Sequence, residues 1–237
     1  MDASIFSSLS ILLPGITFHL IMSLQEVQST ATLLPLEFTP ILKRARWGGE
    51  RLGTQLHKLI GVEQDYGESW ELSDYPGAPT LIASGEFTGW TLSKLIEKNP
   101  KALFGEGKRY PLFPILIKFI DATDRLSLQV HPDAGHLPRF DATKSGKSEA
   151  WVILDALPES CIYAGLKQGI GPEQLRKHLK QGTVEECLHS YPVQKGDCVY
   201  IPAGTLHAIG EGILLAEVQQ TSDVTYRLFD WHRLDQS

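Results

Sequence analysis

The chain has 237 residues, of which 42% are hydrophobic and 21% charged, an ordinary composition for a globular protein with a substantial core. Its formal net charge of −6 gives no bulk attraction for nucleic acid or an anionic membrane. If its ligand is an anion, a few local lysines or arginines must hold it. The cysteines, Cys161, Cys187 and Cys198, include no CxxC pair, which disfavours a disulfide framework or a thiolate zinc site and favours a reducing cytosol.

Residues 1–33 differ from the rest of the chain, and we expect them to form a poorly ordered N-terminal extension. The stretch from Ile5 to Met22 is apolar and resembles the core of a signal peptide, but no Lys or Arg precedes it. Pro14 interrupts the stretch, which argues against a transmembrane helix. We therefore expect one folded domain, residues 34–237, with no membrane partner.

The first half of that domain gives few regular signals. Two motifs stand out: PILKRARWGGERLG, which is basic and carries Trp47, and GESWELSD, which carries Glu68. The hydrophobic pair at 81–82 has a strand-like context. Residues 91–98 (TLSKLIEK) predict a short helix, because Thr91 is a suitable N-cap and an Asn-Pro pair ends the pattern.

The second half reads mostly as strands. The run FPILIKFI is β-branched and aromatic, with the embedded lysine Lys118, and the next segment alternates so that Ser127 and Gln129 share one face. A helix is expected at 172–181, between a first-position proline and a glycine. Further strands are expected at 151–154, 161–163, 197–201, 213–219 and 225–229. Many short strands separated by Gly and Pro turns predict a mainly β sandwich or barrel.

Three of the motifs carry side chains of the types that can bind a metal ion. Gln129 and His131, in LQVHPD, project to the same side of a strand about 7 Å apart and can hold one ion, although a hydrogen-bonded core pair gives the same pattern. Glu149, in GKSEAW, stands at the start of an apolar strand, either as a ligand or as a solvated edge residue. His207 closes GDCVYIPAGTLH, in which a proline stops one strand and Gly204 allows a sharp reversal into the next.

Together these motifs offer two imidazoles, one carboxylate and one amide oxygen. Such a set suits Zn²⁺ or a similar first-row divalent ion and leaves an open position for water or substrate. The segment AEVQQTSDVTYRLFDW then adds an acid and an arginine within apolar strands. Because Glu217 and Arg227 are costly to bury alone, they either pair with each other or face a polar cavity.

In this order, the quoted motifs resemble type I phosphomannose isomerase in its short bacterial form, a family of the cupin superfamily. The resemblance covers about residues 35–235 and includes the cupin spacing G-x5-P-x-G-x2-H, which ends at His207. It implies a cupin-type β-barrel (jelly roll) with a few short accessory helices. It also implies a cytoplasmic, metal-dependent isomerase that interconverts mannose 6-phosphate and fructose 6-phosphate through a cis-enediol. We expect the chain to lack the family's smaller C-terminal β-domain.

The resemblance further implies one Zn²⁺ per chain and two catalytic side chains. Arg227 matches the family's catalytic arginine. Glu217 matches its pocket acid and is our candidate for the base that shuttles the proton, with metal-bound water as the alternative. The implied zinc ligands are those already found by spacing: Gln129, His131, Glu149 and His207.

The implied substrate is a sugar phosphate, and no nucleic-acid partner is expected. Lys118 and Ser127 match residues on the phosphate side, and Trp47 and Glu68 match further pocket residues. Three alternatives stay open: a different enzyme on the same scaffold, such as a cupin-type glucose-6-phosphate isomerase or an iron dioxygenase; a non-catalytic sugar-binding cupin; and an inactive truncated product. The sequence does not indicate the oligomeric state.

Overall fold

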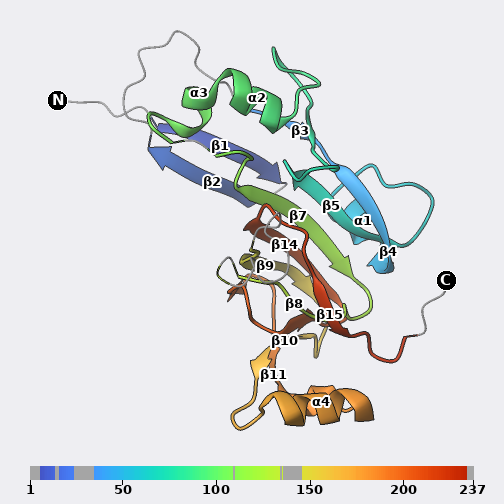
Figure 1. Ribbon diagram of the computed structural model, residues 1–237. Helices are drawn as coiled ribbons and strands as arrows, with labels where there is room; N and C mark the ends of the chain where they lie inside the picture. Colours follow the sequence, from blue (N-terminus) through green and yellow to red (C-terminus); the bar gives the residue numbers. More distant parts are fainter. Residues whose placement is uncertain are drawn as a thin grey trace.

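The structure is a computed structural model that describes residues 6–13, 16–23, 35–108, 110–133, 135 and 146–233. It is mainly β with short helices (Figure 1), which confirms the predicted fold class. About half of the expected N-terminal extension, residues 1–33, lies outside the described ranges. Within it, strand β1 (Phe6–Leu13) pairs antiparallel with strand β2 (Ile16–Ser23), and the division of the chain at residue 34 stays a prediction.

Two antiparallel sheets contain most of the described strands. The larger has the strand order β12-β9-β14-β7-β5-β4, and the smaller has the order β11-β10-β13-β8-β15. The strands of the larger sheet are β4 (Ile41–Gly49), β5 (Tyr66–Leu72), β7 (Ile115–Ala122), β9 (Glu149–Ala156), β12 (Cys198–Ile201) and β14 (Ile213–Gln220). Those of the smaller are β8 (Leu128–Val130), β10 (Cys161–Leu166), β11 (Leu188–Pro192), β13 (His207–Ile209) and β15 (Tyr226–Phe229). A minor pair joins β3 (Phe38–Thr39) to β6 (Leu81–Ile82).

A hydrophobic core fills the space between the two large sheets. Trp151 of β9 and Leu215 of β14 enter it from one side, and Ile162 of β10 and Ile209 of β13 enter it from the other. Each of these side chains is at most 2% exposed. Because successive side chains of a strand point to opposite faces, Glu217, two residues after Leu215, faces the same interior.

The helices cover the outer faces of the sheets. Leu52 of α1 packs on the larger sheet against Phe119 and Leu214, whose side chains point away from the interior. Leu92 of α2 and Phe104 of α3 pack with Leu72 at the β5 side of that sheet. Residues of α4 and of the 3₁₀ turn η2 pack on the smaller sheet. The bounds are α1 (Arg51–Thr54), α2 (Leu92–Lys98), α3 (Pro100–Phe104), α4 (Pro172–Gln181) and η2 (Val184–Cys187).

Both predicted helices are confirmed, together with the signals that bound them. The Thr91 hydroxyl accepts a hydrogen bond from the backbone N–H of Lys94, 3.2 Å away, as an N-cap does. Gly182, directly after α4, takes the left-handed conformation with φ of 71°. Helix α3 was not predicted, because Pro100, which we interpreted as a stop, also occupies the first position of a new helix.

No helix in the described ranges combines the length and the apolar character that crossing a bilayer requires.

Candidate metal centre and active site

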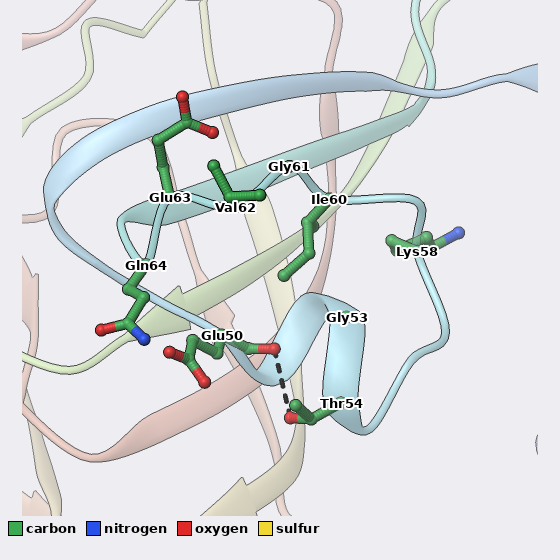
Figure 2. A pocket seen from close by; sticks show the side chains of 9 residues that line it. All are labelled: Glu50, Gly53, Thr54, Lys58, Ile60, Gly61, Val62, Glu63 and Gln64. Atoms are coloured by element: carbon green, nitrogen blue, oxygen red, sulfur yellow. Dashed lines mark hydrogen bonds between the residues drawn. The ribbon is translucent and has the colours of Figure 1, made fainter.

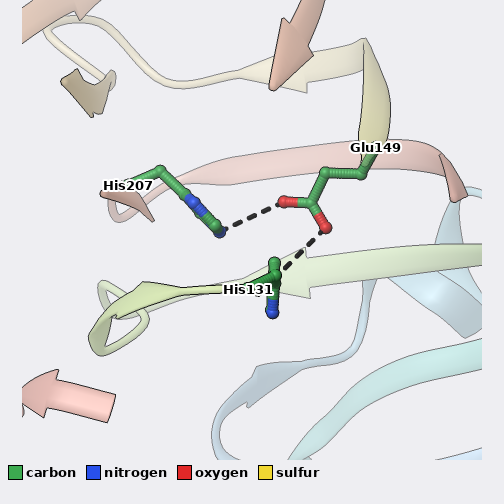
Figure 3. A group of neighbouring side chains, drawn as sticks. All are labelled: His131, Glu149 and His207. Carbon is green, nitrogen blue, oxygen red and sulfur yellow. Dashed lines mark ion pairs between the residues drawn. The ribbon is translucent and has the colours of Figure 1, made fainter. Parts of the chain in front are cut away.

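Two histidines and a glutamate from different strands meet between the sheets (Figure 3). His131 directly follows β8, Glu149 is the first residue of β9, and His207 is the first residue of β13. Nε2 of His207 lies 3.1 Å from Oε1 of Glu149, and Nε2 of His131 lies 3.5 Å from Oε2. One ligand atom from each of the three lies within 4.8 Å of the other two, and all three side chains are buried.

The hydrogen bonds behind the two imidazoles fix which ring nitrogen faces this cluster. Nδ1 of His131 is 2.8 Å from the carbonyl oxygen of Val224, and Nδ1 of His207 is 2.8 Å from that of Thr205. A carbonyl only accepts, so each Nδ1 carries a proton, and each Nε2 is the ring nitrogen directed towards Glu149. Two imidazole nitrogens and a carboxylate converge on one point, and this donor set fits a divalent metal ion.

Gln129 joins the same cluster from β8. Its register partner on β13 is His207, and its Nε2 lies 3.4 Å from Nε2 of that histidine. Burial and the charge of Lys147 lower the pKa of His131 to about 3, so His131 is a neutral ligand at physiological pH. Burial raises the pKa of Glu149, but contacts with His207 and Lys147 outweigh it, so that pKa lies below the usual range.

Sequence reasoning missed one residue at the centre of the site, Lys147. Its ammonium group is 3.1 Å from Nε2 of His131, 3.0 Å from Oε1 of Glu217, and in hydrogen-bond contact with Glu149. The side chain is 4% exposed. The available signal was its spacing, because Lys147 precedes Glu149 by two residues and strand alternation places such pairs on one face.

A row of alternating charges crosses the interior face of the larger sheet from this cluster. Glu217 of β14 is the register partner of Lys118 on β7, and Oε1 of Glu217 lies 3.7 Å from Nζ of Lys118. The same Nζ is 3.3 Å from Oε1 of Glu68 on β5. Glu68 is in turn the register partner of Lys43 on β4. We call this series the charged row; it consists of Lys43, Glu68, Lys118, Glu217, Lys147 and Glu149.

The surroundings raise the pKa of both Glu217 and Lys118 in the charged row, for different reasons. Burial raises the pKa of Glu217, and the nearby Glu149 carboxylate adds to the effect. Burial lowers the pKa of Lys118, but Glu217 and Glu68 outweigh it, so that pKa lies above its ordinary value. Glu217 is therefore an acid with raised proton affinity beside a permanently charged lysine, an arrangement found at sites of proton transfer.

The remaining predicted residues lie around this centre. Arg227 is the register partner of Gln129, but its side chain is 60% exposed, 3.9 Å from Oδ2 of Asp230. Ser127 is buried directly before β8. Trp47 is half-buried and packs against the core between the sheets. The structure thus brings the expected metal ligands together with Glu217, Lys118 and Glu68, and leaves the charged end of Arg227 near the surface.

A separate surface pocket lies beside α1 (Figure 2). Residues between 50 and 64 line it, and the Thr54 hydroxyl donates a hydrogen bond to the Glu50 carbonyl oxygen. None of the described residues of the charged row lines this pocket. It is therefore a feature of the α1 connection, separate from the candidate site.

Comparison with known proteins identifies the family. Residues 36–153 match the family profile described as phosphomannose isomerase type I, catalytic domain. The chain is 38% identical over 206 residues to mannose-6-phosphate isomerase ManA of Bacillus subtilis. This match covers 86% of the chain and 63% of that protein. It is 36% identical to mannose-6-phosphate isomerase of Streptococcus mutans, over 85% of this chain and 62% of that protein.

A solved structure agrees with these matches. The crystal structure of mannose 6-phosphate isomerase from Bacillus subtilis superposes with a TM-score of 0.78 at 34% identity, over 85% of this chain and 63% of that one. The chain thus spans less than two thirds of the length of each of these relatives. The fold is the cupin-type fold of that family. Profile, sequence and structure agree, and the chain belongs to the type I phosphomannose isomerase family.

Proposed function

We propose that the chain is a cytoplasmic, zinc-dependent isomerase that interconverts mannose 6-phosphate and fructose 6-phosphate. The observation that carries the proposal is the direct connection between the metal-binding cluster and a buried acid: Lys147 contacts both Glu149 and Glu217. An aldose–ketose isomerase needs a group that polarises the C1–C2 oxygens beside a group that moves a proton between these carbons. The names of the relatives supply the substrate pair.

The metal would be held by four side chains and would supply a Lewis acid that draws charge from the sugar oxygens. Zn²⁺ is the ion we propose, because borderline-soft imidazole donors combined with one carboxylate are typical of its sites. Both imidazoles are oriented by backbone carbonyls, so the site is organised before the ion binds. The four proposed ligands are Gln129, His131, Glu149 and His207.

Glu217 is the proposed base. Its carboxylate takes the proton from C2 of the open-chain aldose, the C2–H electrons form the C1=C2 bond, and O1 gains a proton to give the cis-enediol. The enediol O2–H then loses its proton as C2=O forms, and Glu217 returns its proton to C1, so the ketose results with no net change in atoms or charge. The raised pKa of Glu217 suits this exchange, because a base is most effective near the working pH.

The other predicted residues complete the proposal. Lys147 contacts Glu217 and would stabilise the negative charge that develops on the sugar oxygens. Arg227 would close over the reacting end from the β15 side. Ser127, Trp47 and Glu68 would line the substrate pocket, with Ser127 and Lys118 towards the phosphate.

The decisive experiment is an assay of the purified chain for fructose 6-phosphate formed from mannose 6-phosphate, with added Zn²⁺ and after chelation. We expect activity that chelation abolishes and metal restores. A folded, metal-loaded chain without activity would refute the isomerase proposal and favour a sugar-binding cupin. Glucose 6-phosphate, tested in parallel, would reveal the alternative isomerase on the same scaffold.

A further inference from the structure

Lys43, at the outer end of the charged row, has no part in the proposed metal centre or in the proposed proton transfer. Lys43 lies on β4, opposite Glu68 of β5 in the strand register, so the two side chains share the interior face. Alternation along β4 places Arg44 and Arg46 on the other, exposed face. Lys43 is therefore the basic residue of this strand that is directed towards the proposed substrate site.

Two carboxylates lie near Lys43: that of Asp223 is exposed to solvent, and that of Glu68 is already engaged by other groups. Oε1 of Glu68 is 3.3 Å from Nζ of Lys118, and Oε2 accepts a hydrogen bond of 2.5 Å from the indole N–H of Trp70. Lys118 is also 3.7 Å from Glu217. The positive charge of Lys118 is thus shared between two carboxylates, so a doubly charged phosphate needs a further cation besides Lys118.

Lys43 makes a different contact. Its ammonium group lies 3.2 Å from the centroid of the Trp70 ring, and no carboxylate of the described residues comes within ion-pair distance of it. The Trp70 ring is 1% exposed and thus firmly held. A cation over an aromatic face is positioned without being neutralised, because the ring offers only a quadrupole. Lys43 can therefore still bind an anion.

We propose that Lys43 binds the phosphate group of the sugar phosphate, at the end of the charged row farthest from the metal ligands. The inference rests on the proposed function for the identity of the substrate. The chain as a whole carries a charge of −6, so a dianionic substrate needs a local cation whose charge is not already balanced. Trp70 holds the ammonium group in place, which reduces the entropy lost when the phosphate binds.

The spacing of the strands supports this placement. Glu217 on β14 and Lys43 on β4 are separated by three strand intervals in the order β14-β7-β5-β4, or roughly 14 Å between backbones. The long lysine side chain covers part of this span. A six-carbon sugar chain with a terminal phosphate would reach across the remainder when its C1–C2 end lies beside Glu217.

The test compares Lys43→Met and Lys43→Arg with the unaltered chain. A lost charge-assisted contact predicts that Lys43→Met raises KM for mannose 6-phosphate about 10- to 100-fold with little change in kcat. Lys43→Arg should recover most of the affinity, because the charge is kept. The inhibition constant of inorganic phosphate should rise in Lys43→Met by a similar factor, whereas unphosphorylated mannose should bind both proteins equally.

Lys94→Met is the matched control. Lys94 also sits over a tryptophan, with Nζ 4.2 Å from the Trp90 ring centroid, but it lies on α2, outside the charged row. Its loss should leave KM unchanged. If Lys43→Met and Lys94→Met behave alike, or if Lys43→Met weakens binding of mannose as much as of mannose 6-phosphate, the proposal is wrong.

Calorimetric binding of mannose 6-phosphate separates this inference from the proposed function. An inactive chain that binds the sugar phosphate, and loses affinity in Lys43→Met, would refute the isomerase and support the phosphate site. An active chain whose affinity is the same in Lys43→Met would do the reverse. A chain that neither reacts with nor binds the sugar phosphate would overturn both.

Discussion

Glu217 is unusual at the scale of single residues because it is an acid, 2% exposed, in the interior of a β-sheet. Two lysines within 4 Å of its carboxylate make this burial tolerable. Burial nevertheless raises its pKa, so the protein keeps an acid whose proton can be gained and lost.

Replacing Glu217 with Gln should preserve the shape of the site while removing the base. We expect kcat to fall by about 10²- to 10⁴-fold, the usual contribution of a general base, with the bound metal unchanged. Steady-state kinetics and metal analysis measure the two effects. Glu71→Gln is the control, because Glu71 is a partly buried acid that also contacts a lysine, Lys58 at 2.6 Å, outside the charged row. Activity of Glu217→Gln within about threefold of the original would favour metal-bound water as the base.

The pKa of Lys43 leads to a prediction for KM at alkaline pH. Burial lowers the pKa of Lys43, and the positive charge of Lys118 adds to this effect. The negative charges of Asp223 and Glu68 act in the opposite direction but do not outweigh it. The Lys43 amino group binds phosphate only while protonated, so its contribution is present below the lowered pKa and lost as pH rises through it. KM for mannose 6-phosphate should therefore increase below the ordinary lysine pKa of 10.5.

The same pH series on Lys43→Arg tests the cause, because a guanidinium stays protonated over this range. Its KM should stay flat where that of the unaltered chain rises. Coincident profiles would show that another group titrates.

At the scale of secondary-structure elements, α1 is held by one buried ion pair. The backbone N–H and Nε of Arg51 donate to the Asp121 carboxylate on β7, each at 2.7 Å. The Asp121 side chain has no exposed surface, and that of Arg51 is 17% exposed. Two further donors of Arg51 bond to backbone carbonyls of Gly212 and Ala122, so a four-residue helix is fixed by one side chain.

Arg51→Met should therefore be strongly destabilising, since it leaves the Asp121 carboxylate buried without its cation. A loss of about 3–5 kcal/mol is typical of such a change, and urea unfolding followed by circular dichroism would measure it. Arg44→Met is the matched control. Arg44 also bonds a carboxylate, Asp65 at 2.6 Å, but on the exposed face, so its loss should leave the unfolding midpoint almost unmoved. Equal effects of the two variants would contradict the argument.

The elements also show which features could be predicted from the sequence. Gln129, His131 and His207 could be found because each stands at a fixed spacing from a strand or a turn, and local geometry sets its direction. Strands β4 and β5 were not predicted: β4 mixes charged residues with glycines, so its alternation is visible only once Arg44 and Arg46 are seen to be exposed.

Lys147 and Lys43 were missed for a different reason. The role of a lysine depends on what lies opposite it on neighbouring strands, and strand order is not a local property. Lys147 contacts Glu217, which lies on a strand about 70 residues further along the chain. Lys43 meets Trp70 only because β4 pairs with β5.

At the scale of the whole molecule, the metal cluster ties the two sheets together. Glu149 belongs to the larger sheet, whereas His131 and His207 are attached to strands of the smaller one. An ion bound by all three therefore stabilises the packing of the sheets as well as the site.

Removing the metal should consequently lower thermal stability. Free ion at about 100 times its Kd contributes about 2.7 kcal/mol, or roughly 5–10 °C in Tm for a domain of this size. Differential scanning calorimetry with chelator, and again after adding Zn²⁺, would measure the shift and its reversal. Glu149→Gln, which weakens the site, should show little response to either treatment. A Tm that does not change when chelator is added would mean that the packing of the sheets does not depend on the ion.

The balance of charge in the charged row has a further consequence for how the site fills. Within the described part of the chain, its ammonium groups equal its carboxylates in number: Lys43, Lys118 and Lys147 against Glu68, Glu217 and Glu149. A divalent cation and a phosphate of charge roughly −2 restore this neutrality only when both are present. Each should therefore strengthen the binding of the other, and by the same factor. Abundant sugar phosphate would then keep the metal site filled at a lower concentration of free metal.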